Sequence, residues 1–344
     1  MKKLIVFLSM FIFAIPLLNQ TTKVEAAGDK SYSIQSVLPD NQIDKNESYF
    51  DLKVEPNKDQ TLKIIIFNTG SKSIKVTAEV NNAYTADSAT IGYDKYNKST
   101  YKNDLPELSS LVEGSRKQTV SLKAGESKEV SFKVKSPDKE YKGIILGGVT
   151  TIANVSPTKS KNLNIQNQVR YVKGVVLRSK DDAVNPDMHM TDAFPKAVSG
   201  SKGIAFRMDN TAPININDVK IKSNIKHNSR DLKYHAKNLQ IAPNSQFDYF
   251  IPIDDFTAGT YKAKITLTGK NGFKKTFTKT ISVSKTDVKQ VEKQTQPAKQ
   301  NNFQWIIILV GIVILIAVAL WMYLYYSQRN DGNSKHGKST RRRK

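Results

Sequence analysis

The sequence predicts an all-β chain of two tandem immunoglobulin-like β-sandwiches, followed by a single C-terminal transmembrane α-helix. Short runs that alternate apolar and polar residues dominate the chain, and Asn, Gly, Ser and Pro bound them, as in strands and turns. The two halves share one order of turn motifs. Near the C-terminus, 22 residues from Trp305 to Tyr326 carry no charge.

The N-terminus has the pattern of a secretory signal. Two lysines precede an apolar run over residues 4–18, and the small-residue site Val24-Glu25-Ala26 follows. A basic segment, an apolar segment and small residues at the cleavage site are typical of exported proteins. We expect residues 1–26 to be a signal peptide that is cleaved after Ala26. The alternative is an uncleaved anchor.

Residues 27–155 form the first predicted sandwich. Residues 49–55 place alternate apolar side chains on one face, and residues 128–134 repeat the pattern. Residues 62–67 are nearly all apolar, as in a central strand. Residues 105–112 come nearest to a helix, with about two turns.

An internal repeat predicts the second sandwich, over residues 162–283. The first half carries the motifs Asn68-Thr69, Gly125-Glu-Ser127 and Tyr141-Lys-Gly143, and the second half carries Asn210-Thr211, Asn244-Ser245 and Gly259-Thr-Tyr261. The turns use residues that tolerate positive φ. The polar segment 156–162 is the expected boundary between the sandwiches.

The first half of the repeat is longer by about 24 residues, which fall within residues 84–118. This insertion holds four tyrosines among polar residues: Tyr84, Tyr93, Tyr96 and Tyr101. Tyrosines on a loop held by a rigid scaffold are typical of recognition surfaces, and flat rings can stack on sugars. We take the four as candidate partner-binding residues. The alternative is that the rings pack onto the sandwich and order the insertion.

The C-terminal part predicts a membrane anchor. Residues 284–303 are rich in Lys and Gln and are expected to form an extended stalk. Residues 304–326 suffice to cross a hydrocarbon core of about 30 Å, with aromatic residues at both ends. The tail, residues 327–344, has seven basic residues against Asp331, and positive charge stays in the cytoplasm. We expect a single-pass cell-membrane protein whose N-terminal region lies outside the cell. The alternatives are a buried core helix and a nucleic-acid-binding tail.

The chain is basic, with a formal net charge of +22, of which +14 belongs to residues 27–303. On the outside of a cell, anionic wall polymers such as teichoic acids are the expected counter-charge. The alternative is that scattered lysines only keep the surface soluble. Lys220-Ile-Lys222 and Lys262-Ala-Lys264 alternate as on a solvated strand face.

The sequence suggests no catalytic, metal or cofactor site. The absence of cysteine excludes disulfides, thiolate zinc sites and thiol nucleophiles. Met188-His189-Met190 has a weak likeness to a copper site, but a strand would turn both methionines inward and the histidine outward. Gly147-Gly148 suits a close backbone approach better than a phosphate loop. We therefore predict a protein that is not an enzyme.

The layout resembles the WxL-interacting proteins of Gram-positive bacteria over nearly the whole chain. The residues that carry the resemblance are 49–54, 61–68, 242–245 and 258–261, with the Gly-Ile-Ile-Leu-Gly-Gly string of residues 143–148 as the most specific. The resemblance implies a first domain that binds peptidoglycan or a WxL-type surface protein. It also implies a second domain that contacts a host extracellular matrix protein.

The combined expectation is a non-catalytic scaffold at the cell surface. It would link the membrane, peptidoglycan or an anionic wall polymer, and a secreted WxL-type surface protein, with an adhesin role toward host matrix and no nucleic-acid partner. The alternatives are an export-side chaperone for surface proteins and, less favoured, an enzyme that modifies the cell wall.

Overall fold

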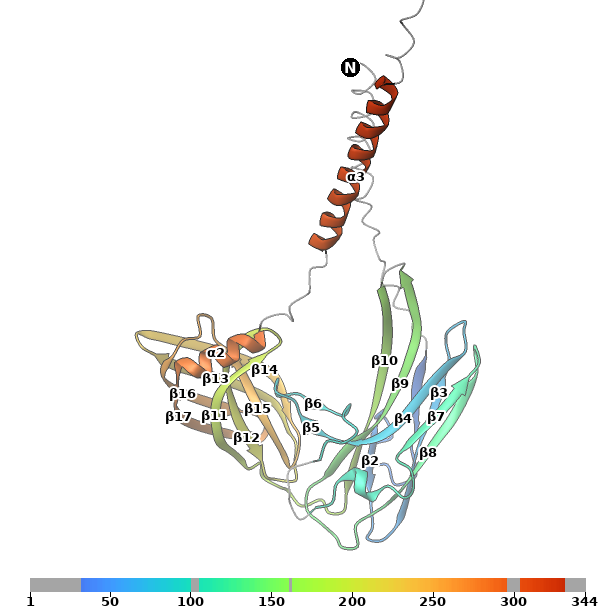
Figure 1. The fold of residues 1–344 in the computed structure, drawn as a ribbon. Coiled ribbons are helices and arrows are strands. Elements are labelled where there is room, and N and C mark those ends of the chain that lie inside the picture. Colours follow the sequence, from blue (N-terminus) through green and yellow to red (C-terminus); the bar gives the residue numbers. More distant parts are fainter. Residues whose placement is uncertain (1–31, 100–104, 161–162, 296–303, 332–344) are drawn as a thin grey trace, which may run out of the picture.

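The computed structural model describes residues 32–99, 105–160, 163–295 and 304–331. Its strands form two sandwiches, and a long C-terminal helix, α3, stands beyond them (Figure 1). This confirms a mostly β chain, while the immunoglobulin-like class stays a prediction. The predicted signal peptide and the end of the basic tail lie outside the described residues.

The first sandwich packs a three-stranded sheet against a five-stranded sheet. The first has the order β1 (Ser33–Val37), β3 (Asp59–Phe67), β8 (Ser127–Lys135), and the second β2 (Phe50–Lys53), β10 (Leu163–Arg178), β9 (Ile145–Ser160), β4 (Ile74–Asn82), β7 (Lys117–Leu122). The predicted alternation holds, because Phe50, Leu52 and Val54 are buried between the sheets. Val130 and Phe132 on β8 complete the same core.

The first sandwich extends further along the chain than the sequence indicated. Residues 163–178, which we expected in the second sandwich, form β10, which pairs antiparallel with β9 and parallel with β2. Val175 and Leu177 are fully buried in the first core. Residues 156–160 of the polar segment form the end of β9, and Ser160 pairs with Leu163 of β10, so the polarity there marks a strand end and not the boundary between the sandwiches.

The second sandwich packs a three-stranded sheet against a four-stranded sheet. The first has the order β11 (Met188–Val198), β12 (Ser201–Asn210), β15 (Ser245–Pro252), and the second β14 (Arg230–Ile241), β13 (Ile216–His227), β16 (Gly259–Thr268), β17 (Lys274–Val283). As predicted, Met188 is buried and Met190 packs against the core, while the exposed His189 contacts Asp187 at 2.9 Å. The described residues hold no cluster suited to a metal ion.

Two asparagines occupy equivalent positions in the two sandwiches and account for the internal repeat. The amide nitrogen of Asn68 donates hydrogen bonds of 2.7 to 3.3 Å to three main-chain oxygens, and that of Asn210 donates two of 2.8 and 2.9 Å. Each asparagine thus joins the end of one strand to the turn before another. Those turns contain Gly125 and Asn244, with φ of 73° and 47°, as the sequence predicted.

Short elements connect these sheets. The insertion forms the small hairpin β5 (Tyr84–Thr85) and β6 (Ile91–Gly92), followed by one 3₁₀ turn, η2 (Leu108–Leu111), in place of two helical turns. A second 3₁₀ turn, η3 (Lys270–Gly272), precedes β17. The predicted close approach at Gly147 is confirmed, because an added Cβ would collide with Leu108 and with the main-chain oxygen of Asn81.

The predicted extended stalk is wrong for its first part. Residues 285–295 form helix α2 (Lys285–Thr295), whose N-terminus is capped by reciprocal hydrogen bonds between Ser284 and Asp287. Val291 is 4% exposed and Val288 packs against the second core. Two valines three residues apart are enough to dock the helix, although the segment is mostly Lys and Gln.

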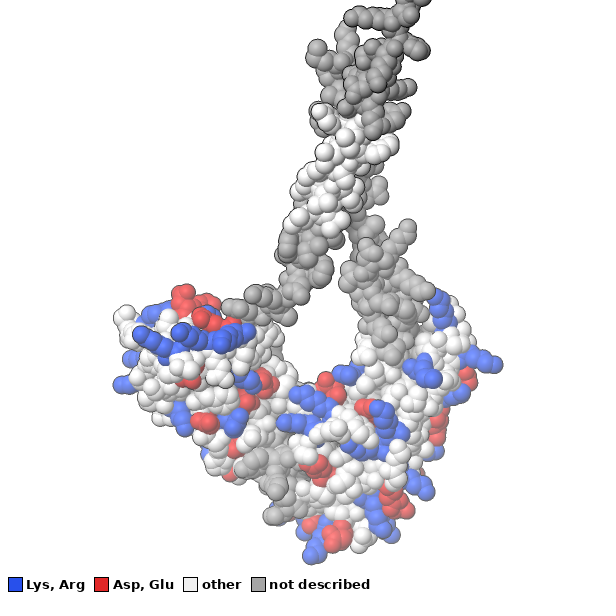
Figure 2. Space-filling model, in the orientation of Figure 1, with Lys and Arg blue, Asp and Glu red and all other residues white. Residues whose placement is uncertain are grey.

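Helix α3 (Gln304–Asp331) carries apolar side chains that are exposed from Leu309 to Leu324. Figure 2 shows its described surface without charged side chains. Among the residues that the structure describes, no helix has both the length and the apolar character needed to cross a bilayer. The transmembrane helix over 304–326 stays a prediction.

Candidate functional site: a cleft in the first sandwich and the inter-sandwich insertion

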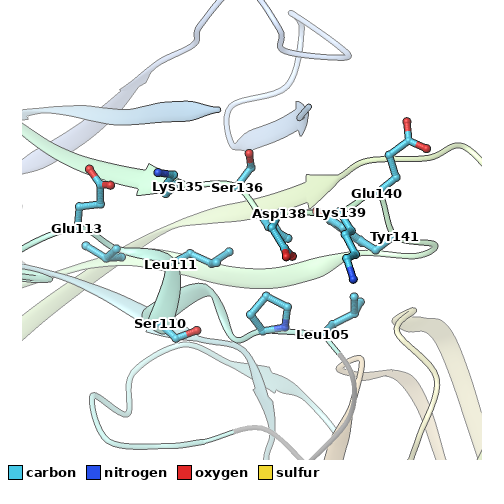
Figure 3. A pocket seen from close by; sticks show the side chains of 13 residues that line it. Leu105, Ser110, Leu111, Glu113, Lys135, Ser136, Asp138, Lys139, Glu140 and Tyr141 are labelled. Carbon is cyan, nitrogen blue, oxygen red and sulfur yellow. The ribbon is translucent and has the colours of Figure 1, made fainter. Parts of the chain in front are cut away.

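The first sandwich carries an open cleft between η2 and the loop that follows β8. The cleft has a volume of about 1010 Å³. Figure 3 shows its side chains, which come from residues 105–113 on one wall and residues 135–141 on the other. A main-chain hydrogen bond of 2.9 Å from Glu113 to Lys133 fixes the first wall to β8. The Ser136 hydroxyl fixes the second wall, because it donates to the Lys58 carbonyl at 3.0 Å.

The floor of the cleft is apolar. Leu105, Leu111 and Val112 pack against the first core from the η2 side. Tyr141 closes the floor from the other wall and is 7% exposed. Its hydroxyl has no hydrogen-bond partner among the described residues, and burial raises its pKa, so the phenol remains a neutral donor. The hydroxyl oxygen itself has less than 1 Å² of exposed surface, so a ligand in the cleft reaches this unpartnered donor only after a local shift of the wall.

The rim of the cleft carries both signs of charge. Glu113 and Asp138 provide carboxylates, and Lys135 and Lys139 provide ammonium groups. Glu140 is bound to Lys180 at 2.9 Å, and this hydrogen bond raises the pKa of Lys180. An apolar floor between opposite charges fits a short peptide that carries both signs.

The sequence did not identify this cleft. Its best signal was the apolar pair Leu105 and Leu111 within an otherwise polar insertion. These residues belong to the segment expected to be helical, and only the folded chain brings residues 135–141 beside them.

The four candidate tyrosines do not share one exposed surface. Tyr84 is buried and its hydroxyl donates to Asp94 at 2.5 Å; burial raises the tyrosine's pKa, and the hydrogen bond lowers that of Asp94. Tyr93 is half-buried beside Gly148, and burial raises its pKa to about 12.

The other two tyrosines differ from this pair. Tyr96 is half-buried, with the Arg116 guanidinium 3.5 Å from its ring centre. Tyr101 lies outside the described residues. Tyr84 and Tyr93 therefore order the insertion, as the alternative from the sequence proposed, and partner binding by the tyrosines stays a prediction.

The hairpin of the insertion reaches across to the second sandwich. The Thr85 hydroxyl lies 2.6 Å from that of Ser245 and accepts a hydrogen bond of 2.9 Å from the Ala242 N–H. The Ala89 carbonyl accepts from the N–H of Gln240 at 2.9 Å, and the Ala89 side chain is fully buried in the second core. The tip of this hairpin is thus part of the second core, although the hairpin follows β4 of the first sandwich.

Charged groups reinforce this contact. The Lys196 ammonium lies 2.6 Å from Asp87 and 3.4 Å from Asp248, and Arg207 lies 2.9 Å from Asp248. Burial works to raise the pKa of Asp248, but the hydrogen bond and charge of Arg207, together with Lys196, hold it below its usual value. Burial works to lower the pKa of Lys196, yet Asp87 raises it. Both groups are charged at neutral pH.

Comparison with protein families decides the identity. Residues 32–153 match the family described as "WxL Interacting Protein, peptidoglycan binding domain", and residues 160–293 match "WxL Interacting Protein, host binding domain". The chain belongs to the WxL-interacting protein family. The two matches follow the order that the resemblance implied. In this WxL-interacting protein the η2 cleft falls within the first match, and the start of the second match includes β10, which completes the first sandwich.

Solved structures show weaker similarity, and a comparison with curated proteins finds no match. The structure described as "Chaperone-tip adhesin complex is vital for synergistic activation of CFA/I fimbriae biogenesis" is 13% identical and covers 71% of this chain and 97% of its own, with a TM-score of 0.31. The YadV chaperone is 10% identical and covers 73% of this chain and 100% of its own, with a TM-score of 0.29. The E. coli chaperone DraB is 15% identical and covers 64% of this chain and 89% of its own, with a TM-score of 0.25.

Proposed function

We propose that this protein is a non-catalytic, membrane-anchored surface protein that binds peptidoglycan through the η2 cleft and holds a secreted WxL-type protein at the cell wall. The observation that carries the proposal is the position of the cleft, because both of its walls, in residues 105–113 and 135–141, lie inside the segment that matches the peptidoglycan-binding family. The second sandwich, inside the host-binding match, faces host matrix.

The chemistry of the cleft favours the peptide part of peptidoglycan over its sugar part. Sugar rings are usually held by exposed aromatic faces, whereas the aromatic side chain in this cleft, Tyr141, is buried. A stem peptide presents methyl groups, amides and both carboxylate and ammonium groups. These match the apolar floor, the free Tyr141 hydroxyl and the mixed charges of Lys139 and Asp138.

The anchor rests on three sequence features and one of the fold. A signal-like N-terminus, an uncharged segment and a basic tail give one orientation. In the fold, the apolar side chains of α3 from Leu309 to Leu324 are exposed. Transfer of this apolar surface from water into lipid is favourable, which supports a membrane anchor.

The sharpest test of the cleft is Tyr141→Phe. Among the described residues the hydroxyl has no hydrogen-bond partner, so its removal should leave stability nearly unchanged. If it donates to peptidoglycan, binding of the full chain in detergent to purified sacculi should fall about 5- to 10-fold. Sedimentation of sacculi with bound protein measures this.

The matched control is Tyr249→Phe, which removes a similarly buried phenol hydroxyl, one that interacts with Tyr234, from the second sandwich. It should leave sacculus binding intact. Equal binding by the Tyr141→Phe and wild-type proteins, or equal losses from both variants, would remove the cleft from the proposal.

A further inference from the structure

The outer surface of the four-stranded sheet in the second sandwich gathers lysines on one face. Side chains alternate across a strand, and antiparallel partners share a face. The register pairs Lys226 with Lys262, and Asn224 with Lys264, across β13 and β16. We call eight exposed residues on β13, β14, β16 and β17 the lysine face: Lys220, Lys222, Lys226, Lys233, Lys237, Lys262, Lys264 and Lys274.

The lysine face has almost no compensating charge. None of its eight ammonium groups forms an ion pair with a carboxylate of the described residues. Asp231, opposite Lys226, is the acid that the register places on this face, and Asp218 at one end is bound to Lys270 at 3.2 Å. Lysines of the first sandwich differ, since Lys63, for example, lies 3.3 Å from Glu129.

The geometry concentrates this charge. Alternate residues on a strand are about 7 Å apart and neighbouring strands about 4.8 Å apart, so the face measures roughly 20 Å by 15 Å. The Debye length in physiological salt is about 8 Å, so each lysine lies within the field of a neighbour. Surfaces that only maintain solubility intersperse both signs of charge. The structure therefore turns the lysines that looked scattered in the sequence into one field.

A shallow depression of about 470 Å³ lies within the lysine face. Lys226, Lys262 and Lys264 line it with ammonium groups, and Thr278 and Thr280 of β17 add hydroxyls. No carboxylate lines it, so its side chains offer mainly donors to a bound anion.

We propose that the lysine face binds a sulfated polysaccharide chain of the host matrix. This rests on the proposed host-facing role of the second sandwich, and it names the partner class. A single sulfate would meet one or two ammonium groups on so flat a surface, whereas a linear polyanion meets many at once. Lysines act as point charges and suit sulfates at varied angles, without the fixed bidentate geometry of arginine.

Other polyanions fit this face less well. Single-stranded nucleic acid is usually held by aromatic stacking, and the residues named on this face include no Phe, Tyr or Trp. An anionic bilayer is usually held by apolar side chains that insert beside the charges, and the alternating apolar residues, such as Ile221 and Ile265, point into the core. A wall polymer of phosphodiesters matches the charge, but the face lies in the host-binding match.

The test uses the full chain in detergent on immobilised heparin, over a series of salt concentrations. A variant with Lys222, Lys226, Lys262 and Lys264 each changed to Gln should lose affinity by about 30-fold or more, with a shallower dependence of log K on log salt. The control changes Lys45, Lys75, Lys123 and Lys133 of the first sandwich, which are also exposed, to Gln. It removes the same charge and should stay within about 3-fold of wild type.

Two results would overturn the proposal. One is equal loss in both variants, which would show that only net charge matters. The other is tighter binding to poly(glycerol phosphate) of matched length than to heparin, which would assign the face to the cell's own wall polymer. Binding to sacculi by the four-lysine variant separates this proposal from the cleft, because that binding should be unchanged, and Tyr141→Phe should in turn leave heparin binding unchanged.

Discussion

At the residue scale, buried side-chain amides donate hydrogen bonds to main-chain oxygens in turns, which apolar side chains cannot do. Asn68 is 2% exposed and Asn210 is fully buried, and each satisfies main-chain oxygens in two separate turns. A buried carbonyl without a partner is costly, so a turn that leaves the sheet needs such a donor. The same residue type at the same place in both sandwiches explains why the Asn-Thr motif recurs in the sequence.

Asn210→Ala should therefore destabilise the second sandwich. The change removes hydrogen bonds to Ile214 and Ala242, and it leaves both carbonyl oxygens without that partner. We expect a loss of about 2 to 4 kcal/mol in the free energy of unfolding, measured with denaturant. The control is Asn215→Ala, since that amide reaches the side chain of Asn217. A loss no greater than in the control would contradict the assignment.

At the element scale, local pattern predicted the strands but not their long-range partners. Phe50, Leu52 and Val54 alternate in the sequence and are buried in the fold, because burial on one face of a strand imposes a period of two. No local pattern shows that β10 completes the first sandwich or that the hairpin of the insertion enters the second core. Both depend on pairing between residues far apart in the chain.

The candidate site shows the same division. The length of the first half predicts the insertion, but the sequence leaves open whether its tyrosines bind a partner or pack onto the sandwich. Burial of Tyr84 depends on Asp94 and Gly92, which a β-hairpin places against its ring. The cleft needs two walls from separate segments, and the lysine face needs four strands in register. Neither can be read from one stretch of sequence.

The hairpin of the insertion should control how firmly the two sandwiches are joined. Combining Thr85→Val with Asp87→Ala removes the Thr85 contacts to Ala242 and Ser245 and the ion pair to Lys196. We expect a broader distribution of distances between spin labels, one on each sandwich, by pulsed electron spin resonance. The reason is that few polar contacts remain to fix the angle between the sandwiches.

A matched control for the hairpin is Ser88→Ala. This serine lies in the same turn, and its hydroxyl lies 2.9 Å from that of Thr90. The distance distribution should remain that of the wild type. If the double variant also kept a wild-type distribution, the apolar contacts around Ile144 and Ala242 and the remaining main-chain hydrogen bonds would suffice to hold the sandwiches, and the proposed role of these two side chains would be wrong.

At the scale of the whole molecule, three surfaces of different chemistry lie on different parts of the chain. The first sandwich offers a cleft with mixed charges, the second an almost purely cationic sheet face, and α3 an apolar surface. Each suits a different phase: peptide-bearing wall, polyanionic glycan and lipid. A chain that joins them end to end is suited to connect three layers of a cell envelope and its surroundings.

This arrangement predicts a definite topology. Protease added to intact cells whose wall has been removed should digest residues 27–303 and leave a short fragment with α3 and the tail, detected by an epitope tag at the C-terminus. The reason is that basic residues such as Arg341 and Lys344 resist translocation, and the uncharged segment holds the chain in the bilayer. In permeabilised cells the tag itself should be lost. Survival of the full-length chain on intact cells would contradict the orientation. Both sandwiches would then lie on the cytoplasmic side of the membrane, away from peptidoglycan and host glycans alike.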